Sequence, residues 1–117
     1  MTGDELAARL QGSSLQLLDV RSAEEYSGAA GYGCDPRQGH IPGAVNIDVS
    51  ELAAPGADVR ELLSAHGLDS DRQIVCYCHS GARSAAAVAL LAAAGVSAEN
   101  YEGSWHEWSH RTDAAAS

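Results

Sequence analysis

The sequence predicts an α/β domain built on a central, mostly parallel sheet of about five strands with helices on its faces. Short, almost wholly apolar runs recur along the 117 residues, as is typical of parallel strands buried on both faces. Stretches with helix-capping residues or helix-forming composition lie between these runs, and this alternation favours a parallel sheet. The length suits one hydrophobic core, so we expect a single domain over residues 1–117.

The first predicted elements are a helix and a strand. Thr2 and Glu5 have the spacing of a capping box, which predicts a helix that ends near Leu10. Residues 15–20, LQLLDV, are mostly apolar up to an aspartate and predict the first buried strand.

A short helix and a long loop are expected next. Ser22 and Glu25 give a second capping box, for a helix that ends near Tyr26. The glycine-rich residues 28–39 predict an irregular loop. After a Pro-Gly turn, residues 44–47 predict another strand.

The middle of the chain is predicted to hold two short helices, a strand and a longer helix. Ser50 and Asp58 are expected to cap the short helices. Residues 74–77, IVCY, predict a buried strand, and the alanine-rich residues 82–94 predict a helix that ends at Gly95.

The last predicted elements are a strand over residues 98–101 and a helix that carries both tryptophans. Ser104 and Glu107 have the spacing of a third capping box at the start of that helix. We expect the tail, residues 112–117, to be frayed.

Composition excludes several classes of function. The net charge of −9 opposes binding to nucleic acid or to an anionic membrane, and no apolar run of roughly 18 residues could span a bilayer. The chain contains no lysine, which excludes a lysine Schiff base. Three cysteines and an amino terminus without a signal-peptide pattern predict reduced thiols in the cytoplasm. No cofactor is predicted.

The stretch that follows residues 74–77 is the strongest candidate for a catalytic site. Cys78 lies where the strand ends and a loop leads into the next helix, so its thiol faces a helix amino terminus and loop amides. Arg83 and His79 also favour a thiolate. Gly81 permits a backbone turn in which successive N–H groups converge on one sulfur atom or anion. Cys78 is therefore predicted to be a nucleophile.

Several separated motifs resemble the rhodanese-like sulfurtransferases. LLDVRSAEEYSG is similar to the Asp-x-Arg segment of that family, GHIPGAVNI to its Gly-His-Ile-Pro-Gly-Ala segment, and CHSGARS to its active-site loop. YEGSWHEW, with glutamate at its second position, and the long loop before Gly39 resemble the carboxyl-terminal catalytic half of tandem thiosulfate sulfurtransferases. The resemblance covers nearly the whole chain and implies the rhodanese-like α/β fold.

The resemblance implies a sulfur shuttle. Cys78 would take a sulfane sulfur from a donor as a persulfide and pass it to cyanide or a thiol. The family's loop corresponds to His79, Ser80, Gly81, Ala82, Arg83 and Ser84, whose amides would hold the persulfide while Arg83 anchors the loop. Arg21 and Trp105 are the candidate substrate-binding residues, with His79 as a second contact. Asp19 and His40 would support the site.

The resemblance also bears on donor and partners. Basic residues in the loop favour thiosulfate over mercaptopyruvate as the donor. A sulfur-acceptor protein and a homodimer that covers the site are both compatible with the sequence. No metal site is predicted, because the cluster of Cys76, Cys78 and His79 lacks a second ligand pair at zinc-finger spacing. Adding Cys34, His40 or His66 as a further ligand does not supply that spacing.

Other functions compete with an active sulfurtransferase. Cysteine phosphatases and arsenate reductases use Cys-x5-Arg, whereas four residues separate Cys78 from Arg83, which favours sulfur over a wider phosphate. A non-enzymatic or partner-dependent persulfide carrier with the same fold remains a second interpretation.

Structural roles compete at single residues. Cys76 is expected to pack one step deeper than Cys78 on the same side, and Cys34 is either a resolving thiol or an exposed bystander. Arg21 has a surface salt bridge to Glu24 or Glu25 as its alternative. Asp19 has hydrogen bonding to the backbone or pairing with arginine as its structural alternative, and His40 has the fixing of a turn. Trp105 and Trp108 have core packing as theirs.

Overall fold

A four-stranded parallel sheet forms the centre of the protein, seen in a computed structural model that describes residues 1–10 and 15–111. The strand order is β2-β1-β3-β4, and every neighbouring pair is parallel. The strands are β1 (Gln16–Asp19), β2 (Val45–Asn46), β3 (Ile74–Tyr77) and β4 (Ala98–Asn100). The predicted α/β class is confirmed, and the predicted frayed tail lies outside the described residues.

The expected strand number of about five is wrong for the described residues, which hold four strands. The four stretches that the sequence predicts as strands correspond to these four strands, and the sequence offers no fifth such stretch. The chain between α2 (Ala23–Ser27) and β2 is instead an irregular loop rich in glycine, a composition that disfavours a strand interior.

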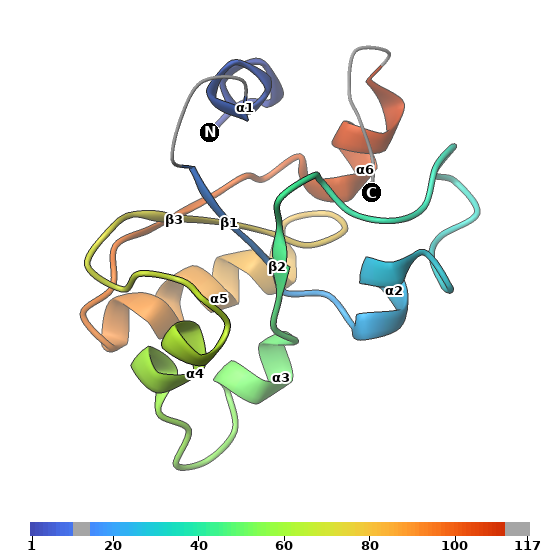
Figure 1. Cartoon of the computed structure of the whole chain (residues 1–117). Coiled ribbons are helices and arrows are strands. Elements are labelled where there is room, and N and C mark those ends of the chain that lie inside the picture. The colour runs from blue at the N-terminus through green and yellow to red at the C-terminus, as the bar shows by residue number, and fades with distance from the viewer. Residues whose placement is uncertain (11–14, 112–117) are drawn as a thin grey trace.

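Helices cover both faces of the sheet (Figure 1). On one face lie α3 (Val49–Leu52), α4 (Val59–Ala65) and α5 (Ala82–Ala93), whereas α1 (Gly3–Leu10) and α6 (Ser104–His110) lie on the other. The β2–β3 and β3–β4 crossovers thus bring α3, α4 and α5 against the sheet, and the ends of the strands are left to loops.

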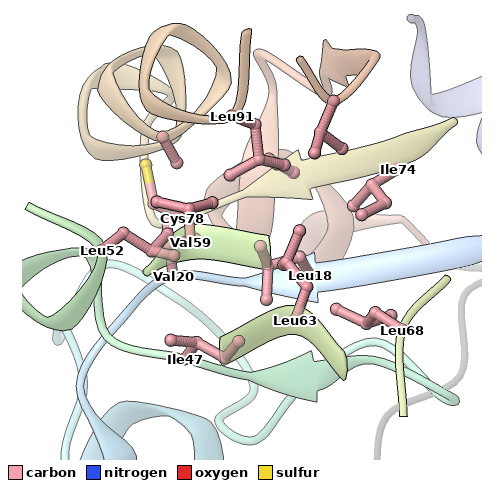
Figure 2. Close-up of a cluster of buried hydrophobic side chains, with 13 residues drawn as sticks. Leu18, Val20, Ile47, Leu52, Val59, Leu63, Leu68, Ile74, Cys78 and Leu91 are labelled. Atoms are coloured by element: carbon pink, nitrogen blue, oxygen red, sulfur yellow. The ribbon is translucent and has the colours of Figure 1, made fainter. Parts of the chain in front are cut away.

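The core consists of two apolar clusters, one on each face of the sheet. Alternating side chains of β1 divide between them, because Leu18 joins the α3–α5 side and Leu17 the α1–α6 side. On β3, Cys76 lies on the α3–α5 side, and so does Cys78 just beyond the strand (Figure 2). Burying a side chain such as Leu18 stabilises the fold by about 1.5–3 kcal/mol.

Most of the predicted helix caps are present. The Thr2–Glu5 pair makes both capping bonds, and Ser22 with Glu25 forms a complete capping box at α2. Asp58 caps α4 through the Glu61 N–H group.

Two predicted caps are wrong. At α3 the capping residue is Asp48, whose carboxylate accepts from the N–H of Ser50, because a carboxylate two residues earlier is the better acceptor at this turn. Ser104 makes no capping bond at α6. No helix among the described residues is long and apolar enough to cross a membrane.

Candidate functional site

The loop after β3 wraps around the sulfur atom of Cys78. Gly81 N–H donates to Sγ at 3.1 Å, and Ser84 approaches it at 3.4 Å with both its backbone N–H and its hydroxyl. Ser80 also contributes its N–H to the thiol, although its side chain is exposed. The predicted convergence of loop amides on Cys78 is therefore visible in the geometry, just ahead of the amino terminus of α5.

Two opposing effects act on the Cys78 thiol. Burial alone would raise its pKa, since only 1% of the residue is exposed. The hydrogen bonds from Ser84, Gly81 and Ser80 favour the thiolate more strongly, so the pKa of Cys78 is lowered from its ordinary value. Cys76 has no such donors, and burial raises its pKa to about 12. The pKa values of these two thiols, two residues apart, are thus shifted in opposite directions.

The hydroxyl of Ser84 serves more than one acceptor. It lies 2.7 Å from Asn100 Oδ1, 3.2 Å from the Gly81 carbonyl and 3.4 Å from Cys78 Sγ. Because a hydroxyl has a single proton, the shorter bond to Asn100 competes with the bond to sulfur. Asn100 also donates from Nδ2 to the Gly81 carbonyl at 3.2 Å, which ties the end of β4 to the loop.

Gly81 is required by the shape of the loop. Its φ of +99° lies in the left-handed region, where a β-carbon is disfavoured. A Cβ atom built on Gly81 would also lie 2.7 Å from the Glu102 carbonyl oxygen. Both constraints arise from the turn that directs the Gly81 N–H group at Cys78.

Ser104 supports the loop from the other side. Its hydroxyl accepts from the N–H of Cys78 at 3.0 Å and donates to the Tyr101 carbonyl at 2.9 Å. Ser104 has a positive φ of 56°, an uncommon conformation for a residue with a side chain. The hydroxyl that was expected to cap α6 instead fixes the backbone of Cys78.

A bidentate ion pair ties the loop to α2. Arg83 donates to the two carboxylate oxygens of Glu25 at 2.8 and 3.0 Å. The bond to Arg83 is the main reason that the pKa of Glu25 is lowered to about 2, against the opposing effect of partial burial. Glu25 therefore belongs both to the capping box of α2 and to the support of the cysteine loop.

His79 is also paired with a carboxylate. Its Nε2 lies 2.9 Å from Asp35 Oδ2, and its ring stacks on Tyr32 with 3.8 Å between the ring centroids. Both basic side chains of the loop, His79 and Arg83, thus face a carboxylate of another segment. Both side chains are thus bound by carboxylates within the protein, which weakens the argument that they favour an anionic donor.

Arg21 lies in the core rather than on the surface. It is 1% exposed, donates to both carboxylate oxygens of Asp19 and donates to the Gly39 carbonyl at 2.6 Å. Its guanidinium also lies 5.3 Å from the ring centroid of Trp105. The alternative of a surface pair with Glu24 or Glu25 is wrong, because Arg21 pairs with Asp19 in the core. A donor could reach Arg21 only by displacing these bonds.

The other candidate residues have structural contacts. His40 Nδ1 lies 2.8 Å from the Tyr26 carbonyl, and the two rings stack. Trp105 is fully buried and donates from Nε1 to the Arg37 carbonyl. Ala82 is exposed at the start of α5. Trp105 therefore packs in the core. The other role considered for it was to line a substrate pocket.

The surface next to the loop carries titratable side chains from α6 and the turn before it. A hollow beside it is lined by Ser80, Glu102, Gly103, His106, Glu107 and His110. Two further hollows, which Asp58 and its neighbours line on the α3–α4 side, contain no residue of the cysteine loop. Among the residues that line this hollow beside the loop are two glutamates and two histidines, and no arginine.

Four residues of this site were missed as site residues by sequence reasoning: Glu25, Asp35, Asn100 and Ser104. Glu25 and Ser104 both fitted the spacing of a capping box. That pattern gave no sign that Glu25 also binds Arg83 or that Ser104 binds the Cys78 N–H group instead of capping α6. Asp35 lies in an irregular loop and Asn100 at the end of a strand, and their distance from the cysteine in sequence gives no sign of contact. The stretch YEGSWHEW contains Ser104, so the resemblance was the one available indication.

Comparison with known proteins identifies the chain's relatives. A family model described as rhodanese-like domain matches residues 2–111. A thiosulfate sulfurtransferase of Azotobacter vinelandii is 32% identical over 117 residues, which cover 94% of this chain and 42% of that protein. A 3-mercaptopyruvate sulfurtransferase of Escherichia coli K12 is 33% identical over 113 residues, which cover 86% of this chain and 38% of that protein.

Solved structures with the same fold include a probable sulfurtransferase. The crystal structure of a probable thiosulfate sulfurtransferase has a TM-score of 0.75 at 44% identity, over 92% of this chain and 43% of that chain. An EanB variant in complex with ergothioneine has a TM-score of 0.84 at 23% identity, over 99% and 31%, which shows the fold alone. This chain spans less than half the length of each of these proteins.

Proposed function

Because the chain belongs to the rhodanese-like domain family, we propose that it is a sulfurtransferase that carries a sulfane sulfur as a persulfide on Cys78. The observation that carries this proposal is the set of N–H groups aimed at Cys78 Sγ from Gly81 and Ser84. These groups favour a thiolate before the reaction, and they remain available to a negatively charged sulfur afterwards.

The proposed cycle has two displacement steps. The Cys78 thiolate attacks the outer sulfur of thiosulfate, a new S–S bond forms, and the old S–S bond breaks with its electron pair leaving on sulfite. The outer sulfur now carries the negative charge of a cysteine persulfide. Cyanide or a thiolate then attacks that sulfur and restores the Cys78 thiolate. No external oxidant, metal or general base is needed.

Loop residues have distinct parts in this proposal. Gly81, Ser84 and Ser80 offer the N–H groups, and Ala82 leaves space at the helix start. Arg83 positions the loop through Glu25, and Asp19 with Arg21 and His40 supports the neighbouring strand end and turn. In this proposal Arg21 and Trp105 support the site, and the loop amides bind the donor.

Phosphate chemistry is the weaker candidate. A phosphate-binding loop needs a free arginine to hold the oxygens of its ligand, whereas Glu25 engages Arg83 through two hydrogen bonds. The shorter Cys-x4-Arg spacing agrees with this, because its N–H groups already approach a single sulfur atom at 3.1 and 3.4 Å.

Thiosulfate is the donor that we propose first, with mercaptopyruvate as the alternative. Both donors appear in the names of relatives. Because carboxylates already bind the His79 and Arg83 side chains, the loop amides would make the main contact with an anionic donor. We expect a weak donor affinity, since few charge-assisted contacts are free for it.

The test is sulfur transfer to cyanide, measured as thiocyanate, with each donor in turn. We expect turnover by the wild type and by Cys34→Ser, and none by Cys78→Ser with an unchanged circular dichroism spectrum. Cys76→Ala is the matched control for loss of a buried thiol, and it should retain transfer. Turnover by Cys78→Ser at the wild-type rate would refute the proposal.

A partner-fed persulfide carrier is the second candidate. It is favoured by the burial of Cys78, which is 1% exposed, and by the hollow beside the loop. A sulfur-donor protein, a sulfur-acceptor protein or a second copy of the chain could then cover this face. The three free thiols fit a reducing compartment such as the cytoplasm. Persulfide formation from a protein donor, but not from either small donor, would favour this candidate.

A further inference from the structure

A group of four metal-ligating side chains lies beside the proposed active-site loop. We propose that Cys34, Asp35, His79 and His106 bind one divalent transition-metal ion, with Zn²⁺ as the best fit. The four residues come from three separate segments: the loop before β2, the cysteine loop and α6. Their ligand atoms all lie within 4.8 Å of one another.

Asp35 is the centre of the group. Its carboxylate, which is fully buried, lies 2.9 Å from His79 Nε2 and 2.8 Å from His106 Nδ1. Cys34 Sγ lies 3.9 Å from His106 Nδ1 and 3.9 Å from Asp35 Oδ1. Every member of the group therefore contacts another member through an atom that can coordinate a metal.

These distances are close to those of a tetrahedral site. Zinc bonds of about 2.0–2.3 Å to nitrogen, oxygen and sulfur place neighbouring ligand atoms about 3.3–3.7 Å apart. With Asp35 bound through Oδ1, His106 Nδ1 would move away from that oxygen by about half an ångström, and Cys34 Sγ would move closer to His106 Nδ1 by a few tenths. His79 Nε2 now contacts the other oxygen, Oδ2, and would turn toward the metal. Side-chain rotations of this size are available to Cys34 and His106, which are both exposed.

The site is held in place by contacts that do not involve its ligand atoms. The ring of His79 stacks on Tyr32, and the His79 carbonyl accepts from the N–H of His106 at 3.0 Å. The Cys78 carbonyl likewise accepts from the N–H of Trp105 at 2.9 Å. These bonds fix α6 against the cysteine loop, so little order would have to be gained when a metal binds.

The ligand set indicates the kind of metal. One thiolate, two imidazoles and one carboxylate form a set of four that suits Zn²⁺, whereas Mg²⁺ and Ca²⁺ prefer oxygen ligands alone. On binding, the Cys34 thiol releases its proton to solvent and coordinates as a thiolate. The metal would join three segments that the chain otherwise holds by hydrogen bonds, and it should therefore stabilise the folded protein.

The experiment is titration of the metal-free, reduced full chain with Zn²⁺ by calorimetry and with Co²⁺ by absorption spectroscopy. We expect one equivalent of Zn²⁺, a rise in Tm when Zn²⁺ is added, and a thiolate-to-cobalt charge-transfer band. Cys34→Ala and His106→Ala should each weaken Zn²⁺ binding by at least about 100-fold, and Cys34→Ala should lose the charge-transfer band.

Two controls separate this site from others. Cys78→Ser should keep the Zn²⁺ equivalent and the charge-transfer band, which excludes coordination by the proposed nucleophile. His66→Ala, which removes an exposed histidine on α4's carboxyl end, should bind Zn²⁺ as the wild type does. Absence of stoichiometric Zn²⁺ binding, or binding that survives both Cys34→Ala and His106→Ala, would overturn the proposal. Neither result depends on sulfur transfer.

Discussion

At the scale of single residues, hydrogen bonding separates the two neighbouring thiols. Cys76 and Cys78 lie on the same side of the sheet and are both buried. Only Cys78 receives bonds from loop amides, and these outweigh the effect of burial on its pKa. The lowered pKa of Cys78 therefore follows from where the strand ends, since the next residues turn their N–H groups toward this thiol.

The pH dependence of Cys78 alkylation checks this point. We expect a midpoint below that of a cysteine in an unstructured peptide, because the pKa of Cys78 is lowered, and no reaction of Cys76, whose pKa is about 12. Ser84→Ala should move the midpoint to higher pH, since it removes a donor to the thiolate. Ser80→Ala, which keeps the backbone N–H, is the matched control. An equal shift in both serine variants would contradict this account.

A second prediction concerns Arg21. Replacement by alanine leaves the buried Asp19 carboxylate without its partner, which should cost about 3–5 kcal/mol of unfolding free energy. Denaturant unfolding measures the loss, and Arg60→Ala, an exposed residue in a 3.8 Å ion pair, should cost at most about 1 kcal/mol. If Arg21→Ala instead raises only the donor KM at unchanged stability, Arg21 binds the donor directly.

At the scale of elements, α2 and α5 are joined through the ion pair of Glu25 and Arg83. The pKa of Glu25 is lowered to about 2 in the folded state, against about 4.3 in an unfolded chain. The pair therefore stabilises the fold above about pH 4.3 and loses this effect as the pH falls toward 2.

Unfolding measured across this pH range tests the pair. Glu25→Gln should lower the stability of the protein at pH 7 by about 1–2 kcal/mol and flatten its decline between about pH 5 and 2. Glu24→Gln alters an exposed neighbour and should leave both unchanged. A wild-type acid profile in Glu25→Gln would show that the pair does not stabilise the fold.

The turn at Gly81 gives a fourth prediction. Gly81→Ala combines a positive φ with a close approach to the Glu102 carbonyl, so the loop must shift and sulfur transfer should fall by about tenfold or more. Gly95 has a similar φ of +78°, but a Cβ atom there would have no neighbour within 4 Å. Gly95→Ala should therefore cost only about 1 kcal/mol of stability, without loss of transfer. Equal transfer rates in the two variants would contradict the role given to Gly81.

At the scale of the whole molecule, the sequence predicted the fold better than the site. β1 and β3 were the most predictable strands, because they are buried along their whole length and leave a nearly continuous apolar pattern. Cys78 and its loop were predictable for the same reason, since they directly follow such a run. The fifth strand was wrong, because no further run existed to form it.

The rest of the site depends on contacts between distant segments. Arg21 looked exposed, and its burial against Asp19, Gly39 and Trp105 could not be seen in local spacing. Asp35 pairs with both His79 and His106, which lie 44 and 71 positions away from it in the chain. Periodicity and capping patterns describe neighbours within a few residues, so they carry no information on such contacts.

The central claim is that Cys78 carries the transferred sulfur, and intact-mass spectrometry tests it most directly. The reduced protein is incubated with thiosulfate, separately with mercaptopyruvate, and then with cyanide. The account predicts a gain of one sulfur atom in the wild type and in Cys34→Ser, its loss on adding cyanide, and no gain in Cys78→Ser. A cyanide-sensitive sulfur that persists in Cys78→Ser would contradict the account, because another residue would then be the carrier.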